Sequence, residues 1–241
     1  MSACWALLIS CEHGGNAVPA AYARLFDPWR ELLDSHRGFD AGALTTAKAL
    51  AAAVHAPLLA TTTSRLVADC NRSIGHPGLF SEITKPLPAR TKKALLEACY
   101  LPHREAVTAA VAELLEAGQG VLHIASHSFT PRLAGVTRRC DVGFLYDPAR
   151  GAEKAFCRSW LRELAGLAPE LLLRRNSPYK GASDGLTTSL RRCFGTAYLG
   201  VELEVNQRFV QAGEAELAAL NDRLVASLTR TLAQAPSCRV P

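Results

Sequence analysis

Two histidines of this 241-residue sequence lie in polar motifs that directly follow apolar stretches. His13 follows the apolar run 5–11 and precedes two glycines, which let the backbone turn sharply. His127 follows the apolar run 120–126 and stands between two serines. Either histidine alone could simply cap a turn, but imidazole is a common metal ligand, and zinc in hydrolases typically has three protein ligands and one open position. The pair therefore predicts a metal site, with zinc as the expected ion.

Asp40 is the favoured third ligand of this site. It lies in the segment HRGFDAGA and would complete a mixed set of imidazole and carboxylate ligands. An acidic residue here could instead only stabilise the N-terminus of the following helix. His36 lies four residues earlier and shares a face with Asp40 if the segment is helical. His36 is therefore an alternative ligand or a partner that orients one, and Glu12 is a further alternative.

Two glutamates, Glu202 and Glu204, alternate with apolar residues near the end of the sequence. If this segment is a strand, both carboxylates point to the same face. Carboxylates inside a sheet are unfavourable unless they meet a cation, a metal or solvent, and an edge strand facing solvent is the simpler alternative. Glu204 lies nearer the carboxyl end, where it could take a proton from a water and deliver it to a leaving amine. We expect Glu204 to be the catalytic acid and base, supported by Glu202.

Several cations are candidates for binding an anionic substrate. Arg72 follows Asn71 in the motif DCNR, and its guanidinium suits a two-point grip on a carboxylate or polarisation of a carbonyl oxygen. We expect Arg72 to act in catalysis and, with Asn71, in substrate binding. Arg138 and Lys180 are the expected contacts for a second carboxylate, although any one of these cations could simply be a solvated surface charge.

A cysteine nucleophile is the competing interpretation. Cys11 and Cys70 lie near expected strand ends, with His13 and Arg72 close in sequence, and a neighbouring imidazole can activate a thiol. Cysteines that end buried strands are usually inert core residues, however, so we favour metal-dependent chemistry. His123 lies inside its apolar run, and we expect it in the core or behind the ligands.

The elements that must position these residues alternate between strands and helices. Short apolar runs predict strands, and apolar residues at helical spacing predict helices. The alternation predicts an α/β fold, a single domain over residues 1–241 with a central mostly parallel or mixed sheet and helices on both faces. Ligands of such sheets gather at the carboxyl ends of the strands, where the histidines and Glu204 fall. The expected strands are 5–11, 58–61, 65–69, 120–126, 141–146, 170–174 and 197–205, and the expected helices are 20–33, 40–54, 89–117 with a break near Pro102, 149–165, 185–192 and 214–233.

Composition argues against several classes of protein. The net charge is +5, but the basic residues are scattered, with no stripe of Lys and Arg among aromatics that would predict nucleic-acid binding. No apolar stretch reaches the roughly 20 residues of a membrane span. The eight cysteines are spread singly and no secretory signal is evident, which predicts reduced thiols and a cytoplasmic protein. The expected partner is a small anionic substrate, and the sequence gives no indication of the oligomeric state.

Taken together, these segments resemble the N-formylglutamate amidohydrolase family. The order and spacing of the motifs carry the resemblance, rather than any single motif. Two of them, EHGGN and HRGFD, differ from the family's usual form and indicate a divergent branch. The motifs are EHGGNAVP at 12–19, HRGFDAGA at 36–43, DCNRS at 69–73, YLPH at 100–103, HSFTP at 127–131, NSPYKG at 176–181 and ELEVNQ at 202–207.

The resemblance implies a zinc hydrolase related in fold to zinc carboxypeptidases and aminoacylases. Its reaction would remove an N-acyl group from an amino acid, typically formate from N-formyl-L-glutamate in histidine degradation. The resemblance implies that His13 and His127 are metal ligands and that Asp40 is the carboxylate ligand. It also implies that Glu204 is the acid and base and that Arg72 contacts the substrate or the oxyanion.

One position departs from the carboxypeptidase pattern. That pattern places a glutamate three residues after the first histidine, and this sequence has Asn16 there. The third ligand is therefore open at this stage. Two other functions also stay open: hydrolysis of another small N-acyl or peptide substrate, and a non-catalytic binding module on the same fold.

Overall fold

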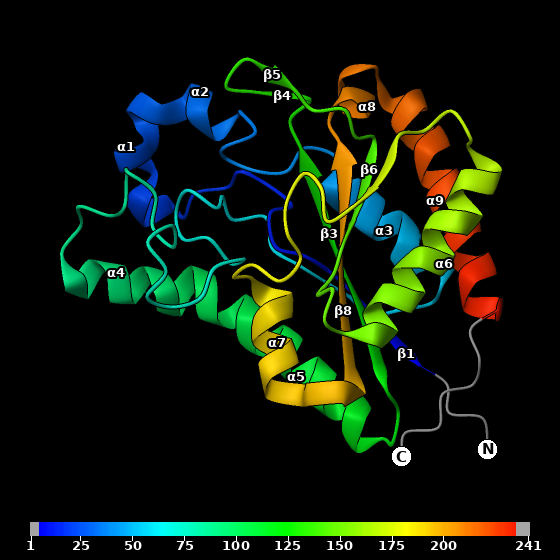
Figure 1. The fold of residues 1–241 in the computed structure, drawn as a ribbon. Helices are drawn as coiled ribbons and strands as arrows, with labels where there is room; N and C mark the ends of the chain where they lie inside the picture. Colours follow the sequence, from blue (N-terminus) through cyan, green and yellow to red (C-terminus); the bar gives the residue numbers. More distant parts are fainter. Residues whose placement is uncertain (1–4, 235–241) are drawn as a thin grey trace.

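A six-stranded sheet forms the centre of the protein (Figure 1). The structure is a computed structural model and describes residues 5–234. The sheet has the order β2-β1-β3-β8-β6-β7, and a separate two-stranded hairpin is formed by β4 and β5. The strands are β1 Ala6–Cys11, β2 Leu58–Ala60, β3 Val121–Phe129, β4 Arg132–Leu133, β5 Val136–Thr137, β6 Val142–Leu145, β7 Leu173–Arg175 and β8 Tyr198–Asn206.

Most neighbouring strands of the sheet are parallel, as the sequence predicted. β1 pairs in parallel with β2 and β3, β3 with β8, and β6 with β7. Only the β6–β8 pair of this sheet is antiparallel. All nine residues of both β3 and β8 are buried, which is typical of central strands covered on both faces. The carboxyl ends of β1, β3 and β8 therefore meet at one edge of the sheet.

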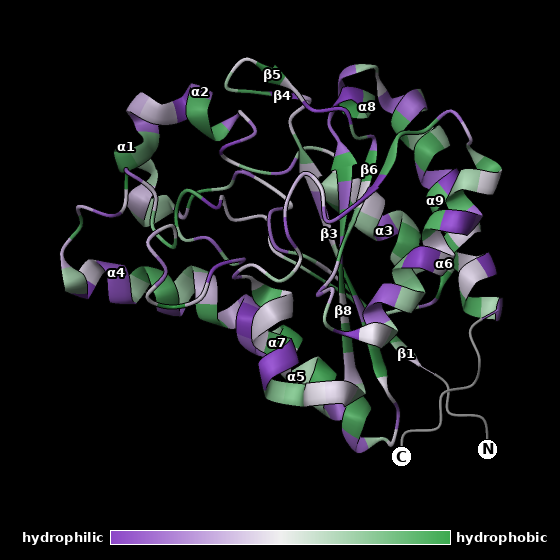
Figure 2. Ribbon diagram, in the orientation of Figure 1, coloured by the Kyte–Doolittle hydropathy of each residue, from purple (hydrophilic) through white to green (hydrophobic). Residues whose placement is uncertain are grey.

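Helices cover both faces of this sheet. Successive strand residues point to opposite faces, so Ile9 packs in the cluster with α3, α6 and α9, whereas its neighbour Leu8 packs with α5 and α7. Figure 2 shows apolar and polar residues alternating along α6 and α9, as expected for helices with one buried face. The helices are α3 Ala43–Ala53, α5 Leu101–Glu116, α6 Gly151–Leu167, α7 Leu186–Phe194, α8 Arg208–Gln211 and α9 Glu214–Gln234.

Two predicted helices are interrupted. The segment 20–33 is not one helix but a series of short turns that includes α1 Ala23–Phe26 and α2 Arg30–Leu33, with Pro28 in the 3-10 turn between them. The segment 89–117 is α4 Ala89–Leu95, a π-helical turn at Leu96–Tyr100 and then α5. The predicted break near Pro102 is therefore a change of helix type rather than a gap: a π-helical turn ends two residues before Pro102, which has no N–H to donate.

The predicted strand at 65–69 is wrong. Residues 65–67 form a turn, and Leu66 and Val67 are buried in a separate apolar cluster with Phe26, Ile83 and Leu95. The apolar pattern of this segment therefore comes from burial beneath a long loop region rather than from pairing in a sheet. The hairpin of β4 and β5 was not predicted, because its strands have only two residues each.

Two further predictions concern the cysteines and the membrane. The six cysteines in the described part of the chain are all free thiols, while Cys4 and Cys238 lie outside it. Among residues 5–234, no helix is long and apolar enough to cross a membrane.

Candidate active site

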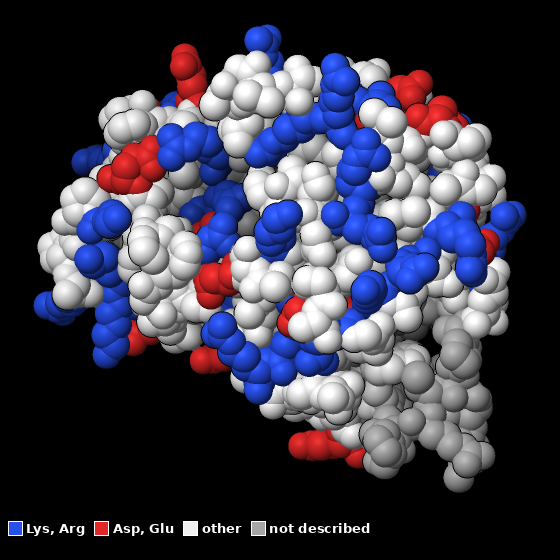
Figure 3. Space-filling view, in the orientation of Figure 1, with Lys and Arg blue, Asp and Glu red and all other residues white. Residues whose placement is uncertain are grey.

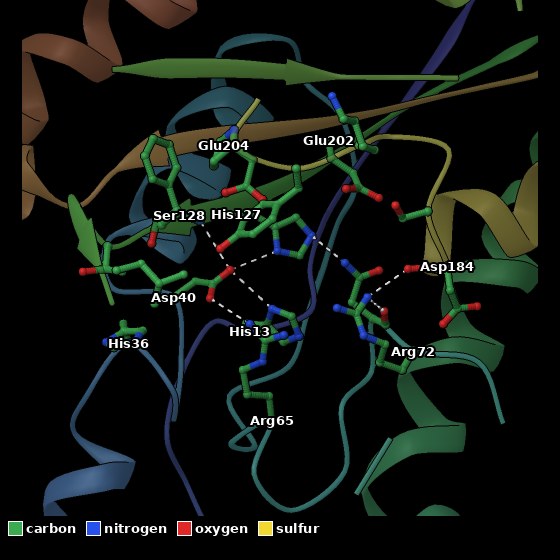
Figure 4. Close-up of a pocket in the computed structure, with 18 residues that line it drawn as sticks. His13, His36, Asp40, Arg65, Arg72, His127, Ser128, Asp184, Glu202 and Glu204 are labelled. Atoms are coloured by element: carbon green, nitrogen blue, oxygen red, sulfur yellow. Dashed lines mark hydrogen bonds and ion pairs between the residues drawn. The ribbon is translucent and has the colours of Figure 1, made fainter. Parts of the chain in front are cut away.

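Three side chains from separate elements converge at the carboxyl edge of the sheet (Figure 4). His13 lies just after β1, Asp40 just before α3, and His127 within β3, two residues before its end. Oδ2 of Asp40 lies 3.3 Å from Nδ1 of His13 and 3.0 Å from Nδ1 of His127. One ligand atom from each residue lies within 4.8 Å of the other two, so the group could hold a metal ion. The backbone N–H of Asp40 donates to the carbonyl of His13, which fixes the two loops to each other.

Asp40 faces the two histidines in the structure, whereas the alternative third ligand His36 is not part of this group. The residue that caps α3 is Gly42, and no side-chain hydrogen bond caps this helix, so Asp40 does not act as a helix cap. Its carboxylate instead faces the two histidines. His36 is exposed and lines the cavity beside Asp40, but it is not part of the group of three. Burial, together with the nearby Arg138 and Arg37, lowers the pKa of His36 and favours its neutral form.

Each histidine of the group contacts a second carboxylate through its other ring nitrogen. Nε2 of His13 lies 2.7 Å from Oδ1 of Asp69, and Nε2 of His127 lies 2.9 Å from Oε2 of Glu12. Carboxylates in this position hold the rings so that Nδ1 faces the centre of the site, and such partners are usual for metal-binding histidines. Glu12, an alternative ligand in the sequence analysis, therefore lies behind His127. Asp69 was missed, although it is the first residue of the DCNR motif.

Arg65 is the second residue that the sequence analysis missed. Its guanidinium contacts Asp69 at 2.7 Å and Asp40 at 3.4 Å. Burial opposes its charge, but the two carboxylates outweigh burial and raise its pKa. No motif in the sequence distinguished Arg65 from the other scattered arginines. The sequence analysis also placed Arg65 in a strand, whereas the structure places it in a turn beside the site.

The buried charges of the site suit a cation. Three buried carboxylates, those of Glu12, Asp40 and Asp69, contact the two histidines, whereas the guanidinium of Arg65 contacts only Asp40 and Asp69, so negative charge is in excess. Burial alone would raise the pKa of Asp40, but His13, His127 and Arg65 together hold it well below its usual range. Burial alone would lower the pKa of His127, but Asp40 and Glu12 raise it well above its usual range. In the metal-free protein, Asp40 and Glu12 therefore favour the protonated form of His127, and a metal cation could supply this positive charge instead.

Glu204 lies on β8 directly opposite His127 of β3. Its side chain lines the same cavity and is buried, and its Oε2 has no hydrogen-bond partner in the described part of the chain. Burial raises the pKa of Glu204 to about 8, since the nearby His127 only partly offsets it. Glu202, on the same strand face, accepts a hydrogen bond of 2.7 Å from the Thr187 hydroxyl. Glu204 thus has the free carboxyl oxygen and the perturbed pKa of a group that exchanges protons.

A cavity of about 420 Å³ joins these groups to the remaining candidates. Asn71 and Arg72 line it, and Figure 4 places Arg72 beside Asp184, across the cavity from Asp40. Nη1 of Arg72 donates to the carbonyl oxygens of Asp184 at 2.9 Å and Asn71 at 3.1 Å, which holds the guanidinium in place. In turn, Oδ1 of Asn71 accepts a hydrogen bond from the backbone N–H of Leu186, the first residue of α7. Figure 3 shows Lys and Arg side chains gathered around the hollow on this face.

The two cations predicted to bind a second carboxylate differ in position. Lys180 lines the cavity and is exposed. Arg138 is not among the residues that line it. The guanidinium of Arg138 stacks over the rings of Phe129 and Tyr179, at 5.7 and 5.1 Å from their centroids, and it donates to the hydroxyl of Tyr179 at 3.0 Å.

Neither cysteine of the competing interpretation is suited to nucleophilic attack. Cys11 is fully buried, and burial with the nearby Glu12 raises the pKa of its thiol to about 12. Cys70 is also buried, and burial raises its pKa as well. Both thiols therefore stay protonated at neutral pH. His123 is a core residue, as expected, and its two ring nitrogens lie 2.7 Å from the hydroxyls of Tyr198 and Ser10.

The fold and this site define an α/β protein with a candidate metal centre at the carboxyl edge of its sheet. The family model of the N-formylglutamate amidohydrolases matches residues 5–210, and the chain belongs to this family. A gene product of Agrobacterium tumefaciens with a known crystal structure is similar over 94% of this chain and 90% of its own, with 31% identity and a TM-score of 0.81. The N-formylglutamate amidohydrolase of Ralstonia eutropha is similar in fold, with a TM-score of 0.71 and 18% identity over 95% of this chain and 93% of its own. No curated protein has a significantly similar sequence.

Proposed function

We propose that this protein is a metal-dependent hydrolase of the amide bond in N-acyl amino acids, with N-formyl-L-glutamate as the first substrate to test. One observation carries the proposal: the convergence of His13, Asp40 and His127 beside the buried, unpaired carboxyl group of Glu204. Membership of the N-formylglutamate amidohydrolase family supports the reaction class. The substrate, the metal and the role of each residue are part of the proposal.

The three converging residues fit a divalent cation. Two imidazole nitrogens and one carboxylate oxygen are a common ligand set of hydrolytic zinc, and the excess negative charge around them favours a dication. Zinc is the proposed ion. Held by His13, Asp40 and His127, it would polarise the amide carbonyl and make a water molecule more acidic.

Glu204 is the proposed proton carrier. With a cation nearby, its carboxyl group ionises more readily than its pKa of about 8 in the metal-free protein implies. The carboxylate then takes a proton from the attacking water and delivers it to the amine nitrogen as the carbon–nitrogen bond breaks. Its position opposite His127 on the adjacent strand keeps this proton transfer next to the metal ligands.

Arg72 is the proposed anchor of the substrate's α-carboxylate. Its guanidinium lines the cavity and is fixed by two backbone carbonyls, so it can present its remaining N–H groups without a large loss of side-chain freedom. Asn71 is the proposed second contact, because it lines the same cavity next to Arg72 in sequence. Lys180 is the proposed partner of a side-chain carboxylate such as that of glutamate. Arg138 acts indirectly, because it holds Tyr179, which precedes Lys180 in sequence and also lines the cavity.

The test is hydrolysis of N-formyl-L-glutamate by the zinc-loaded protein, compared with N-acetyl amino acids and dipeptides. We expect the wild type to release the free amino acid, the Glu204→Gln variant to lose at least about 100-fold in kcat, and a chelator to abolish turnover reversibly. Turnover of another substrate of the panel but not N-formyl-L-glutamate would refute the narrow assignment. No turnover of any of them, or full activity of Glu204→Gln, would refute the proposed function.

A further inference from the structure

Apolar side chains line one part of the proposed active-site cavity. They are Phe129, Leu133, Pro178 and Tyr179. Phe129 is buried, whereas Leu133 and Tyr179 are 42% and 45% exposed and line the same cavity. Val136 pairs with Leu133 in the hairpin of β4 and β5 and is 67% exposed, but it does not line the cavity. Exposed apolar groups gathered at the mouth of a polar cavity indicate a binding surface for an apolar group.

This surface is held in place by Arg138. The guanidinium stacks on both Phe129 and Tyr179 and bonds the Tyr179 hydroxyl. The backbone N–H of Arg138 donates to the carbonyl of Pro131 at 2.8 Å, which closes the base of the hairpin that carries Leu133. Arg138, which the sequence predicted to contact a second carboxylate, therefore supports an apolar wall instead.

The Phe129 and Leu133 part of this wall lies on the side of the metal group away from the proposed carboxylate anchor, whereas Tyr179 also lines a neighbouring cavity together with Arg72. In Figure 4, Ser128 and Asp40 are on one side, Arg72 and Asp184 are on the other, and His13 and His127 are between them. Phe129 directly follows Ser128 in β3, and the hairpin with Leu133 begins three residues later. A substrate whose α-carboxylate contacts Arg72 and whose amide lies over the histidines can direct its acyl group toward Phe129 and Leu133.

We propose that this wall is a subsite for a bulky apolar acyl group, so that the preferred substrates are N-aroyl or longer N-acyl amino acids rather than formyl derivatives. This rests on the proposed function and names its substrate class. The reaction remains hydrolysis: water adds to the carbonyl carbon, the carbon–nitrogen bond breaks, the acyl group leaves as a carboxylate, and the amine takes up a proton. A formyl group has only a hydrogen atom on its carbonyl carbon and would leave Leu133 and Tyr179 uncovered.

The test measures ligand binding rather than turnover. Titration calorimetry on Glu204→Gln protein with zinc chloride present compares N-benzoyl-L-glutamate with N-formyl-L-glutamate. We expect the benzoyl compound to bind at least about tenfold more tightly, because a phenyl ring buries apolar surface that formate lacks. Adding Leu133→Ser should weaken benzoyl binding about fivefold and leave formyl binding unchanged. Adding Val136→Ser is the matched control, because Val136 lies on the same hairpin but does not line the cavity.

The outcomes separate the two proposals. Equal affinity for the two compounds, or an equal effect of Leu133→Ser and Val136→Ser on benzoyl binding, would overturn the acyl subsite. Neither result would affect the proposed hydrolysis, which is refuted if the zinc-loaded wild type turns over no N-acyl amino acid or if Glu204→Gln keeps full activity. Tight binding of the benzoyl compound that depends on Leu133 would support the subsite whatever the rate of turnover.

Discussion

Replacing Glu204 by glutamine should stabilise the metal-free protein, and increasingly so as the pH rises. The carboxyl group is 5% exposed and has no hydrogen-bond partner for Oε2 in the described part of the chain. Burial raises its pKa from 4.5 to about 8. Because the folded state holds the proton more tightly than the unfolded state, this group's contribution to stability is fully present below about pH 4.5. It is lost as the pH rises to about 8.

The expected size of this effect follows from the pKa. Each pKa unit corresponds to about 1.4 kcal/mol, so ionising Glu204 in the folded protein costs about 5 kcal/mol in full. Glutamine has the same shape and does not ionise. We therefore expect Glu204→Gln to match the wild type within about 1 kcal/mol at pH 5 and to exceed it by several kcal/mol at pH 8.

Urea unfolding of chelator-treated wild type and Glu204→Gln at pH 5, 6, 7 and 8 measures this difference. All other titrating groups are the same in both proteins, so their contributions to the difference in unfolding free energy largely cancel. Glu202→Gln is the matched control on the same strand face, and we expect no comparable gain because Thr187 already donates a hydrogen bond to Glu202. A difference between wild type and Glu204→Gln that stays constant from pH 5 to pH 8 would refute the account of Glu204 as a carboxyl group destabilised by burial.

Three further predictions concern the surroundings of the site. Asp69→Asn should weaken zinc binding about 10- to 100-fold, because it removes the charged partner of His13. A competition titration with a chromophoric chelator measures this, and unchanged zinc affinity would contradict the orienting role of Asp69. Arg72→Ala should raise KM for an N-acyl amino acid at least about tenfold, with a smaller change in kcat, whereas a loss confined to kcat would argue against carboxylate binding. Cys11→Ser should keep most of the activity, since the Cys11 thiol is buried and stays protonated, and abolished activity in a folded protein would favour a thiol mechanism.

The sequence was sufficient for the main layers of the fold because the central strands are long, buried and apolar. The first half of β3 is apolar apart from His123, β8 alternates apolar residues with Glu202 and Glu204, and all residues of both strands are buried. The sequence was insufficient for the region between β2 and α4. There, Leu66 and Val67 are apolar because they are buried under loops, and no local pattern distinguishes that burial from a strand.

Some site residues could likewise be predicted from local sequence patterns, whereas others depend on contacts between distant segments. His13, His127 and Glu204 were predictable because each lies at or near the carboxyl end of a recognisable strand. Asp69 and Arg65 were not, because their roles depend on the loop that brings them against His13 and Asp40. The position of Arg138 between two aromatic rings likewise depends on segments far apart in the sequence.

Metal content measured by mass spectrometry on the purified protein tests the central claim most directly. After dialysis against zinc, we expect about one tightly bound zinc per wild-type chain and much less than one in His13→Ala, Asp40→Ala and His127→Ala. His123→Ala is the comparison, since His123 bonds Tyr198 and Ser10 away from the group of three, and any folded protein it yields should keep its zinc. A wild type without tightly bound metal, or folded His13→Ala and His127→Ala variants that keep full zinc, would contradict the account.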